Sequence, residues 1–76
     1  MTEDLCLKFL KKYKKLSRKE LAQKADRTLT SIDRALFKLL RDGKVNRVLE
    51  KFKIGHIVGF RLYYYINSKH LYSGVN

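Results

Sequence analysis

The sequence contains neither proline nor tryptophan, and Cys6 is its only cysteine. A lone cysteine excludes an intramolecular disulfide framework, and with His56 and His70 it gives no metal-ligand spacing, so we expect no bound metal and a reducing, intracellular compartment. Acidic residues are also scarce, because 7 Asp and Glu face 18 Lys and Arg, which gives a net charge of +11. A polyanion best relieves such a charge, since neutralised phosphates release their counterions. Nucleic acid is therefore the leading class of partner, ahead of an anionic membrane surface.

Long hydrophobic runs are missing as well. No stretch approaches the roughly 20 apolar residues that span a bilayer, and the start Met1-Thr2-Glu3-Asp4 lacks the basic and apolar segments of a signal peptide. We therefore expect a cytoplasmic, nucleoid-associated protein that does not bind membranes. With 76 residues, 45% of them hydrophobic, the chain is expected to form one domain over residues 1–66 and a tail over residues 67–76.

Catalytic constellations are absent from the sequence. No combination of His, Cys, Ser and acid suggests a nucleophile with its base, and no glycine-rich loop suggests an enzyme's phosphate site. We expect no enzymatic activity and no cofactor.

The first part of the chain predicts an amphipathic helix that begins at Thr2. Glu3 and Asp4 favour the positive end of its dipole. We expect one face of this helix to join the core. Its apolar residues, which recur at helical spacing, are Leu5, Cys6, Phe9, Leu10, Tyr13 and Leu16. The lysines expected on the opposite side are Lys8, Lys11, Lys12 and Lys15. We interpret this lysine face as a solvated surface, with phosphate contact as the alternative.

Start and stop signals predict two further helices. Ser17 and Glu20 match the capping box that opens a short second helix, and the polar residues 26–28 form the turn that follows it. Thr28 is the expected N-cap of the third helix, and Gly43 ends it. The residues of the inward stripe of this helix are Leu29, Ile32, Ala35, Leu36, Leu39 and Leu40.

The β-branched and aromatic residues after Val45 predict a hairpin with strands over residues 45–52 and 60–66. Alternation in the second strand assigns one set of side chains to the core, namely Phe60, Leu62, Tyr64 and Ile66. The connecting loop is expected over residues 51–59. Its apolar residues Ile54, Ile57 and Val58 could fold back on the hairpin, contact another subunit or make apolar contacts in a groove.

Three helices followed by a hairpin resemble the winged helix-turn-helix family over essentially Glu3 to Ile66. The residues that carry the resemblance are Leu21-Ala22-Gln23-Lys24, Thr28, Ile32, Arg34-Ala35-Leu36, Leu39, Gly43-Lys44-Val45 and the strand Tyr63-Tyr64-Tyr65. Asp26 stands where the family frequently has glycine, and Arg27 where an apolar residue usually plugs the turn, a role that Leu29 could take. The resemblance implies an α+β fold with three helices and a two-stranded antiparallel β-hairpin wing. It also implies a third helix in the major groove and a wing along the backbone or minor groove.

The residue chemistry gives the expected DNA contacts. With Ile32 at the centre of the buried face, helical geometry turns a polar arc outward. The contacts expected from this helix are Thr28, Thr30, Ser31, Arg34, Lys38 and Arg41. Arg34 suits bidentate bonding to guanine, and Asp33 at the margin of the arc could pair locally instead. The contacts expected from the hairpin, mainly with phosphates, are Arg47, Lys51, Lys53, His56 and Arg61.

The function that fits these residues best is a sequence-specific transcription regulator that binds double-stranded DNA. We expect a homodimer, formed through Leu7, Phe37 or the Leu71-Tyr72 tail. Phe37 itself is interpreted as packing within the domain, with an interface as the alternative. Two other functions stay open: a protein-interaction adaptor, which predicts a dominant apolar surface, and an RNA or single-strand binder that stacks bases on its tyrosines.

Overall fold

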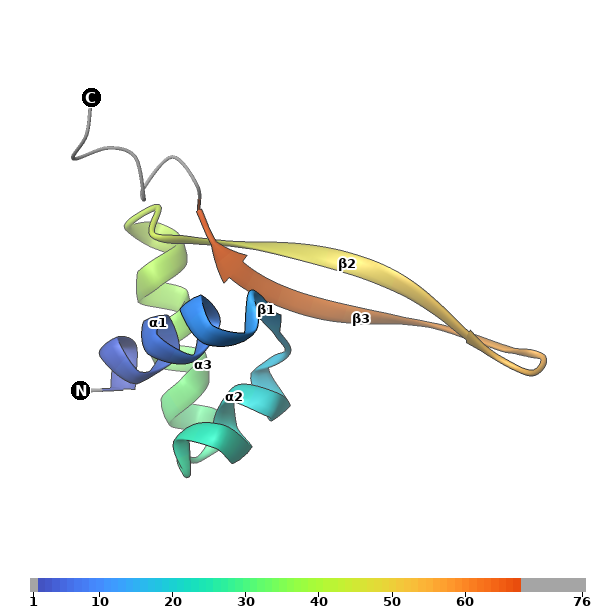
Figure 1. The fold of residues 1–76 in the computed structure, drawn as a ribbon, viewed down its shortest axis with the longest axis horizontal. Helices are drawn as coiled ribbons and strands as arrows, with labels where there is room; N and C mark the ends of the chain where they lie inside the picture. Colours follow the sequence, from blue (N-terminus) through green and yellow to red (C-terminus); the bar gives the residue numbers. More distant parts are fainter. Residues whose placement is uncertain (1, 68–76) are drawn as a thin grey trace.

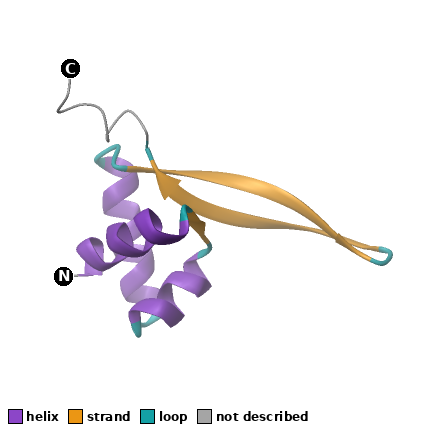
Figure 2. Ribbon diagram, viewed as in Figure 1, coloured by secondary structure: helices purple, strands orange, loops and turns teal. Residues whose placement is uncertain are grey.

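The computed structural model describes residues 2–67 as an α+β fold of three helices and a three-stranded antiparallel sheet (Figure 1). The element order is α1 (Thr2–Tyr13), β1 (Lys15–Leu16), α2 (Arg18–Ala25), α3 (Leu29–Arg41), β2 (Val45–Ile54) and β3 (Ile57–Ile66). The helices group into one body, and β2 and β3 project from it as an arm with no helix beside its outer half (Figure 2). This layout is compatible with a winged helix. Beyond Asn67, the expected tail lies outside the described residues.

The sheet has one strand more than predicted. β1 pairs with β3 through the positions Lys15↔Tyr65 and Leu16↔Tyr64, so the strand order is β1-β3-β2. Lys14, at φ 70°, ends α1 and turns the chain into β1. Leu16 is buried as expected, but from a strand. A strand of two residues is too short to show an alternating pattern, and Leu16 also fits the helical spacing of α1. For these two reasons β1 was not predicted, and Leu16 was assigned to the first helix.

The predicted start of α2 and the predicted start and end of α3 are confirmed. Ser17 and Glu20 form the capping box, with the Glu20 backbone N–H 3.3 Å from Ser17 Oγ and the Ser17 N–H 3.0 Å from Glu20 Oε1. Thr28 caps α3 by accepting the Ser31 N–H at 3.2 Å. Gly43, at φ 74°, follows α3 and donates its N–H to a carbonyl of the last turn. The left-handed conformation there is one that glycine adopts without cost.

Asp26 ends α2 in the left-handed conformation, at φ 54°. The winged helix-turn-helix family that the sequence resembles often has glycine at this position, and aspartate is one of the few other residues that tolerate the left-handed region. Leu29 does not plug the turn and does not join the inward stripe, because it is an exposed residue at the first position of α3. Asp26 therefore takes the place of the usual glycine at this left-handed position. The suggested role of Leu29 as the apolar plug of the turn is wrong.

The core lies where the three helices meet the base of the sheet. Its buried members are Cys6, Leu10, Leu16, Leu21, Ala22, Ala25, Ile32, Ala35, Leu36, Leu39, Val45 and Tyr64. Tyr13 was expected among them but is 42% exposed. Burial, with a smaller contribution from Glu3, raises the pKa of the Cys6 thiol from 9.0 to about 11. Among residues 2–67, no helix has the length and apolar character needed to cross a membrane.

Candidate nucleic-acid interface

The outward side of α3 carries the polar residues that the sequence assigned to it. Thr28, Thr30, Arg34, Lys38 and Arg41 are exposed, and Ser31 is half-buried. Ile32, Ala35, Leu36 and Leu39 on the opposite side are buried. We call the six residues Thr28, Thr30, Ser31, Arg34, Lys38 and Arg41 the α3 face. Because the opposite side of α3 packs in the core, the polar side chains of the α3 face are available to a partner.

Two hydroxyls at the start of the α3 face are already engaged with each other. Thr28 Oγ1 accepts the Ser31 backbone N–H and donates to Ser31 Oγ at 3.0 Å. These bonds satisfy the helix N-terminus and fix both side chains. Thr30, between them in sequence, is exposed, so it is the better placed hydroxyl for contact with a base edge.

Acidic groups border the α3 face. Lys38 Nζ lies 3.5 Å from Glu3 Oε1 on α1, and Arg41 Nε lies 3.7 Å from Asp42 Oδ1. Both cations are more than half exposed, and exposed pairs of this kind contribute only about 0–1 kcal/mol. A phosphate could therefore displace either carboxylate at little cost.

Glu3 is the residue of this region that sequence reasoning missed. From the sequence, Glu3 was interpreted only as an acid that stabilises the positive end of the α1 dipole. The packing of α1 on α3 brings it to a groove lined by Thr2, Glu3, Ser31, Arg34, Ala35 and Lys38. Since Glu3 and Lys38 belong to different helices far apart in the sequence, no local pattern could have revealed the pair. Asp33, in contrast, pairs away from the face with Arg18, 3.0 Å distant, as its marginal position suggested.

Phe37 is exposed beside the α3 face rather than packed within the domain. It follows Ile32 by five residues, which places it about 140° around the helix from the centre of the buried side, and it is 69% exposed. The packing interpretation is therefore wrong. Leu7, the second candidate for a dimer contact, is half-buried against the core, and Leu71-Tyr72 lie outside the described residues. Phe37 is thus the candidate that offers a free apolar surface.

The expected wing loop over residues 51–59 is largely strand. β2 and β3 stay paired from Val45↔Ile66 to Ile54↔Ile57, which leaves only Gly55 and His56 unpaired at the tip. Gly55 has φ 59°, as the first central position of a tight two-residue hairpin turn requires. Both strands were predicted too short, because Gly55 and Gly59 led us to assign the apolar residues between them and beside them to a loop.

All the expected contacts on the hairpin are exposed. They are Arg47, Lys51, Lys53, His56 and Arg61. Directly paired residues share a face of a two-stranded ribbon, so Lys51 lies beside Phe60 and Lys53 beside Val58. On the predicted core face of β3, Tyr64 is buried and Leu62 and Ile66 are half-buried, but Phe60 is 62% exposed. The face was assigned correctly, and Phe60 is exposed because the arm has passed the edge of the body there.

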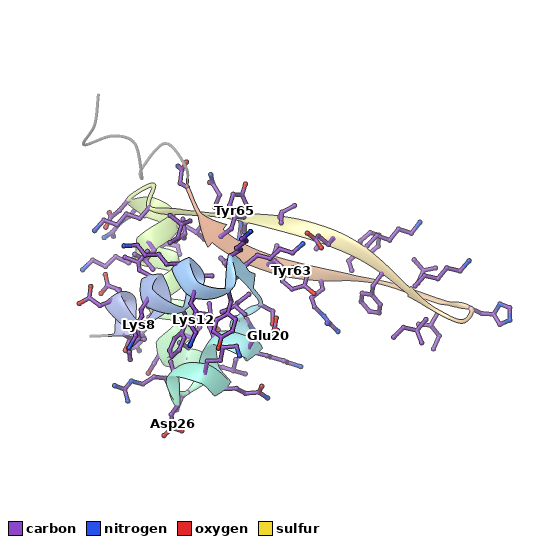
Figure 3. All side chains as sticks on the ribbon, in the orientation of Figure 1. Lys8, Lys12, Glu20, Asp26, Tyr63 and Tyr65 are labelled. Atoms are coloured by element: carbon purple, nitrogen blue, oxygen red, sulfur yellow. The ribbon has the colours of Figure 1, made fainter. Side chains whose placement is uncertain are left out.

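The opposite face of the sheet holds a cluster around β1. Lys15 pairs with Glu50, and its Nζ lies 5.1 Å from the centroid of the Tyr63 ring. Figure 3 shows Tyr63 and Tyr65 along β3. Tyr63 is half-buried, so part of its ring is already covered in the free protein. These contacts give Tyr63 a structural role that is independent of any base stacking.

The predicted lysine face of α1 is exposed, as both its interpretation as a solvated surface and the alternative of phosphate contact require. Lys8, Lys11 and Lys12 are exposed, and Figure 3 labels Lys8 and Lys12 beside α1. Lys15 is exposed too, but it belongs to β1. Tyr13 has Lys12 Nζ 5.4 Å and Lys24 Nζ 4.1 Å from its ring centroid. The described residues 2–67 contain no cluster of His, Cys, Asp and Glu that could hold a metal ion.

In comparisons with known proteins, no family model and no curated protein matches this chain.

Proposed function

We propose that this chain binds double-stranded DNA as a winged-helix protein and acts as a sequence-specific transcription regulator. The observation that carries the proposal is the α3 face, an exposed polar and cationic surface on a helix whose other side is fully packed. A rigid helix with a free polar side is what the major groove admits. The net charge of +11 supports a polyanionic partner.

Each residue of the α3 face has a role that its position allows. Arg34, in the middle of the helix and exposed, suits two hydrogen bonds to the major-groove edge of guanine. Thr30 lies one turn earlier and can reach a neighbouring base or phosphate. Lys38 and Arg41 suit phosphates at the edge of the groove once Glu3 and Asp42 are displaced. Arg47, Lys51, Lys53, His56 and Arg61 on the arm would follow the backbone or the minor groove.

A selection from random duplexes at two salt concentrations tests the proposal. We expect enrichment of a defined site and an affinity that falls as salt rises, because phosphate contacts release counterions. Arg34→Ala should cost about 1–3 kcal/mol at the selected site and relax the preference for one base pair. Lys8→Ala is the matched control, since it removes one exposed positive charge outside the α3 face. Equal losses of discrimination in both variants would contradict the assignment of Arg34.

Phe37 favours a second candidate, a protein-interaction surface that a homodimer could use. Phe37 is 69% exposed beside the α3 face, so a second copy of the chain could bury it in a shared interface. This candidate predicts self-association that Phe37→Ser abolishes, together with weak DNA binding that hardly depends on salt. Sedimentation at several protein concentrations separates it from a monomer that binds DNA.

A further inference from the structure

The outer end of the arm exposes apolar side chains that folding does not require. Ile54 and Ile57 form the last pair before the turn, and they are 68% and 69% exposed. Val58 and Phe60, which the register places on the opposite face of the ribbon, are also exposed. We call the pair Ile54 and Ile57 the arm tip. Residues so exposed add little to the stability of the monomer, and a contiguous apolar end on a protruding element marks a contact surface.

The charges around the arm tip are all of one sign. From Lys51 to Arg61 the sequence has no acid, and the nearest one, Glu50, is paired with Lys15 at the base of the arm. Lys51 and Lys53 lie on one face of the ribbon, whereas Arg61, which is paired across from Glu50, lies on the other face, so cations occur on both faces. A partner that fits must be anionic on two sides and must accept apolar side chains between them. The minor groove of a duplex matches, with a phosphate row on each rim and stacked bases below.

The arm is built as a stiff element. Its ten residue pairs continue without interruption to the turn. The ring of Phe52 covers Gly59 so closely that an added Cβ there would lie 2.5 Å from Phe52 Cζ. The guanidinium of Arg61 lies 5.2 Å from the centroid of the same ring. This stack fixes the ribbon just behind the arm tip, so the tip would not fold back on the arm when it meets a surface.

The length of the arm suits penetration of a groove. The six residues from Leu49 to Ile54 extend about 17 Å, because the five steps between them each rise about 3.4 Å in an antiparallel strand. The minor groove is about 7.5 Å deep, so the arm tip can reach its floor while Lys51 stays near the level of the phosphates. The long axis of the molecule runs along this arm (Figure 1).

We propose that the arm tip inserts into the minor groove, where Ile54 and Ile57 wedge a base-pair step apart and bend the duplex. Apolar side chains that enter this groove partly unstack base steps and kink the DNA. The inference rests on the proposed DNA binding and adds a second action to it, since α3 would select the site and the arm would deform it. Flexible steps near the site would then be favoured without any hydrogen bond to their bases.

The test measures bending by energy transfer between dyes at the two ends of a duplex that carries the selected site. The wild-type protein should shorten the end-to-end distance. It should also bind a duplex with a mismatched step under the arm about tenfold more tightly than the intact duplex, because the unstacking cost is already met. The double variant Ile54→Thr, Ile57→Thr keeps β-branched residues in the strands. It should lose the bend and the mismatch preference while retaining the salt dependence of binding.

A matched control is Val48→Thr with Leu49→Thr, which makes similar changes near the base of the arm and should retain the bend. Circular dichroism checks that each variant is folded. Duplex binding without bending, or bending equal in both double variants, would overturn the inference and leave the proposed function standing. Absence of any duplex binding would overturn both.

Two further outcomes would also overturn the inference. One is binding to vesicles of anionic phospholipid that the arm-tip variant abolishes, with duplex bending unaffected. The other is a dimer in sedimentation that the arm-tip variant dissociates, again with duplex bending unaffected. Either result would assign Ile54 and Ile57 to a different partner.

Discussion

The helical body and the arm differ in how they use apolar side chains. In the body, Ile32 and Leu36 are almost completely buried, and the polar residues around them face outward. In the arm, Ile54 and Phe60 are mostly exposed, although the arm is paired as regularly as any strand. Burial explains the apolar residues of the body, because it stabilises the fold. The apolar residues of the arm need another explanation, and contact with a partner supplies one.

Alanine substitutions should separate the two regions most strongly. Leu36→Ala should lower the free energy of unfolding by about 2–5 kcal/mol, because it opens a cavity in the core. Ile54→Ala should change it by no more than about 0.5 kcal/mol, as expected at an exposed site. Urea unfolding followed by circular dichroism measures both. If Ile54→Ala were as destabilising as Leu36→Ala, the arm tip would be part of the folding core and the comparison would fail.

The next effect concerns the charges of the arm. Replacing Lys51 and Lys53 together by alanine should weaken binding to all duplexes and reduce the slope of log K against log salt by about 2, because each lysine would neutralise one phosphate. Lys8→Ala with Lys11→Ala removes the same charge from α1 and should leave most of the slope intact. Binding at four or more salt concentrations gives the slopes. A larger change in the α1 variant would move the phosphate-binding surface from the arm to the lysine face.

The smallest effect should come from Glu3. Glu3→Gln frees Lys38 from its partner and removes a negative charge at the edge of the α3 face. We expect an affinity gain worth less than about 1 kcal/mol, since exposed ion pairs are weak, and we expect it mainly at low salt. Asp4→Asn removes a neighbouring charge of α1 and serves as the control. A gain of the same size in the control would indicate a general charge effect rather than release of Lys38.

Sequence reasoning predicted the features that depend on neighbouring residues. The capping box of Ser17 and Glu20, the cap at Thr28 and the end of α3 at Gly43 follow from local chemistry, and all three are present. The alternation in β3 likewise identified the buried Tyr64. Each of these features depends on a short segment of the chain, so it can be predicted without knowledge of the fold.

Features that depend on distant contacts were missed or misplaced. β1 exists because Lys15 and Leu16 meet β3 at the far end of the described chain, and two residues carry no period. The exposure of Phe60 depends on where the arm extends past the helical body. The alternation of side chains predicts the face on which Phe60 lies, but not whether the body covers that face. The pairing of Glu3 with Lys38 depends on how α1 packs against α3. Phe37 was misjudged because it lies on the boundary between the buried and polar sides of α3, where only the packing of neighbouring elements decides whether a side chain is covered.

The most direct test of the account is a titration of the ¹⁵N-labelled protein with its selected duplex, followed by amide chemical shifts. We expect the largest changes on the α3 face, at Thr30 and Arg34, and on the arm from Lys51 to Val58, with small changes at Lys8 and Lys12. Changes confined to the lysine face of α1, or no changes at saturating duplex, would contradict it.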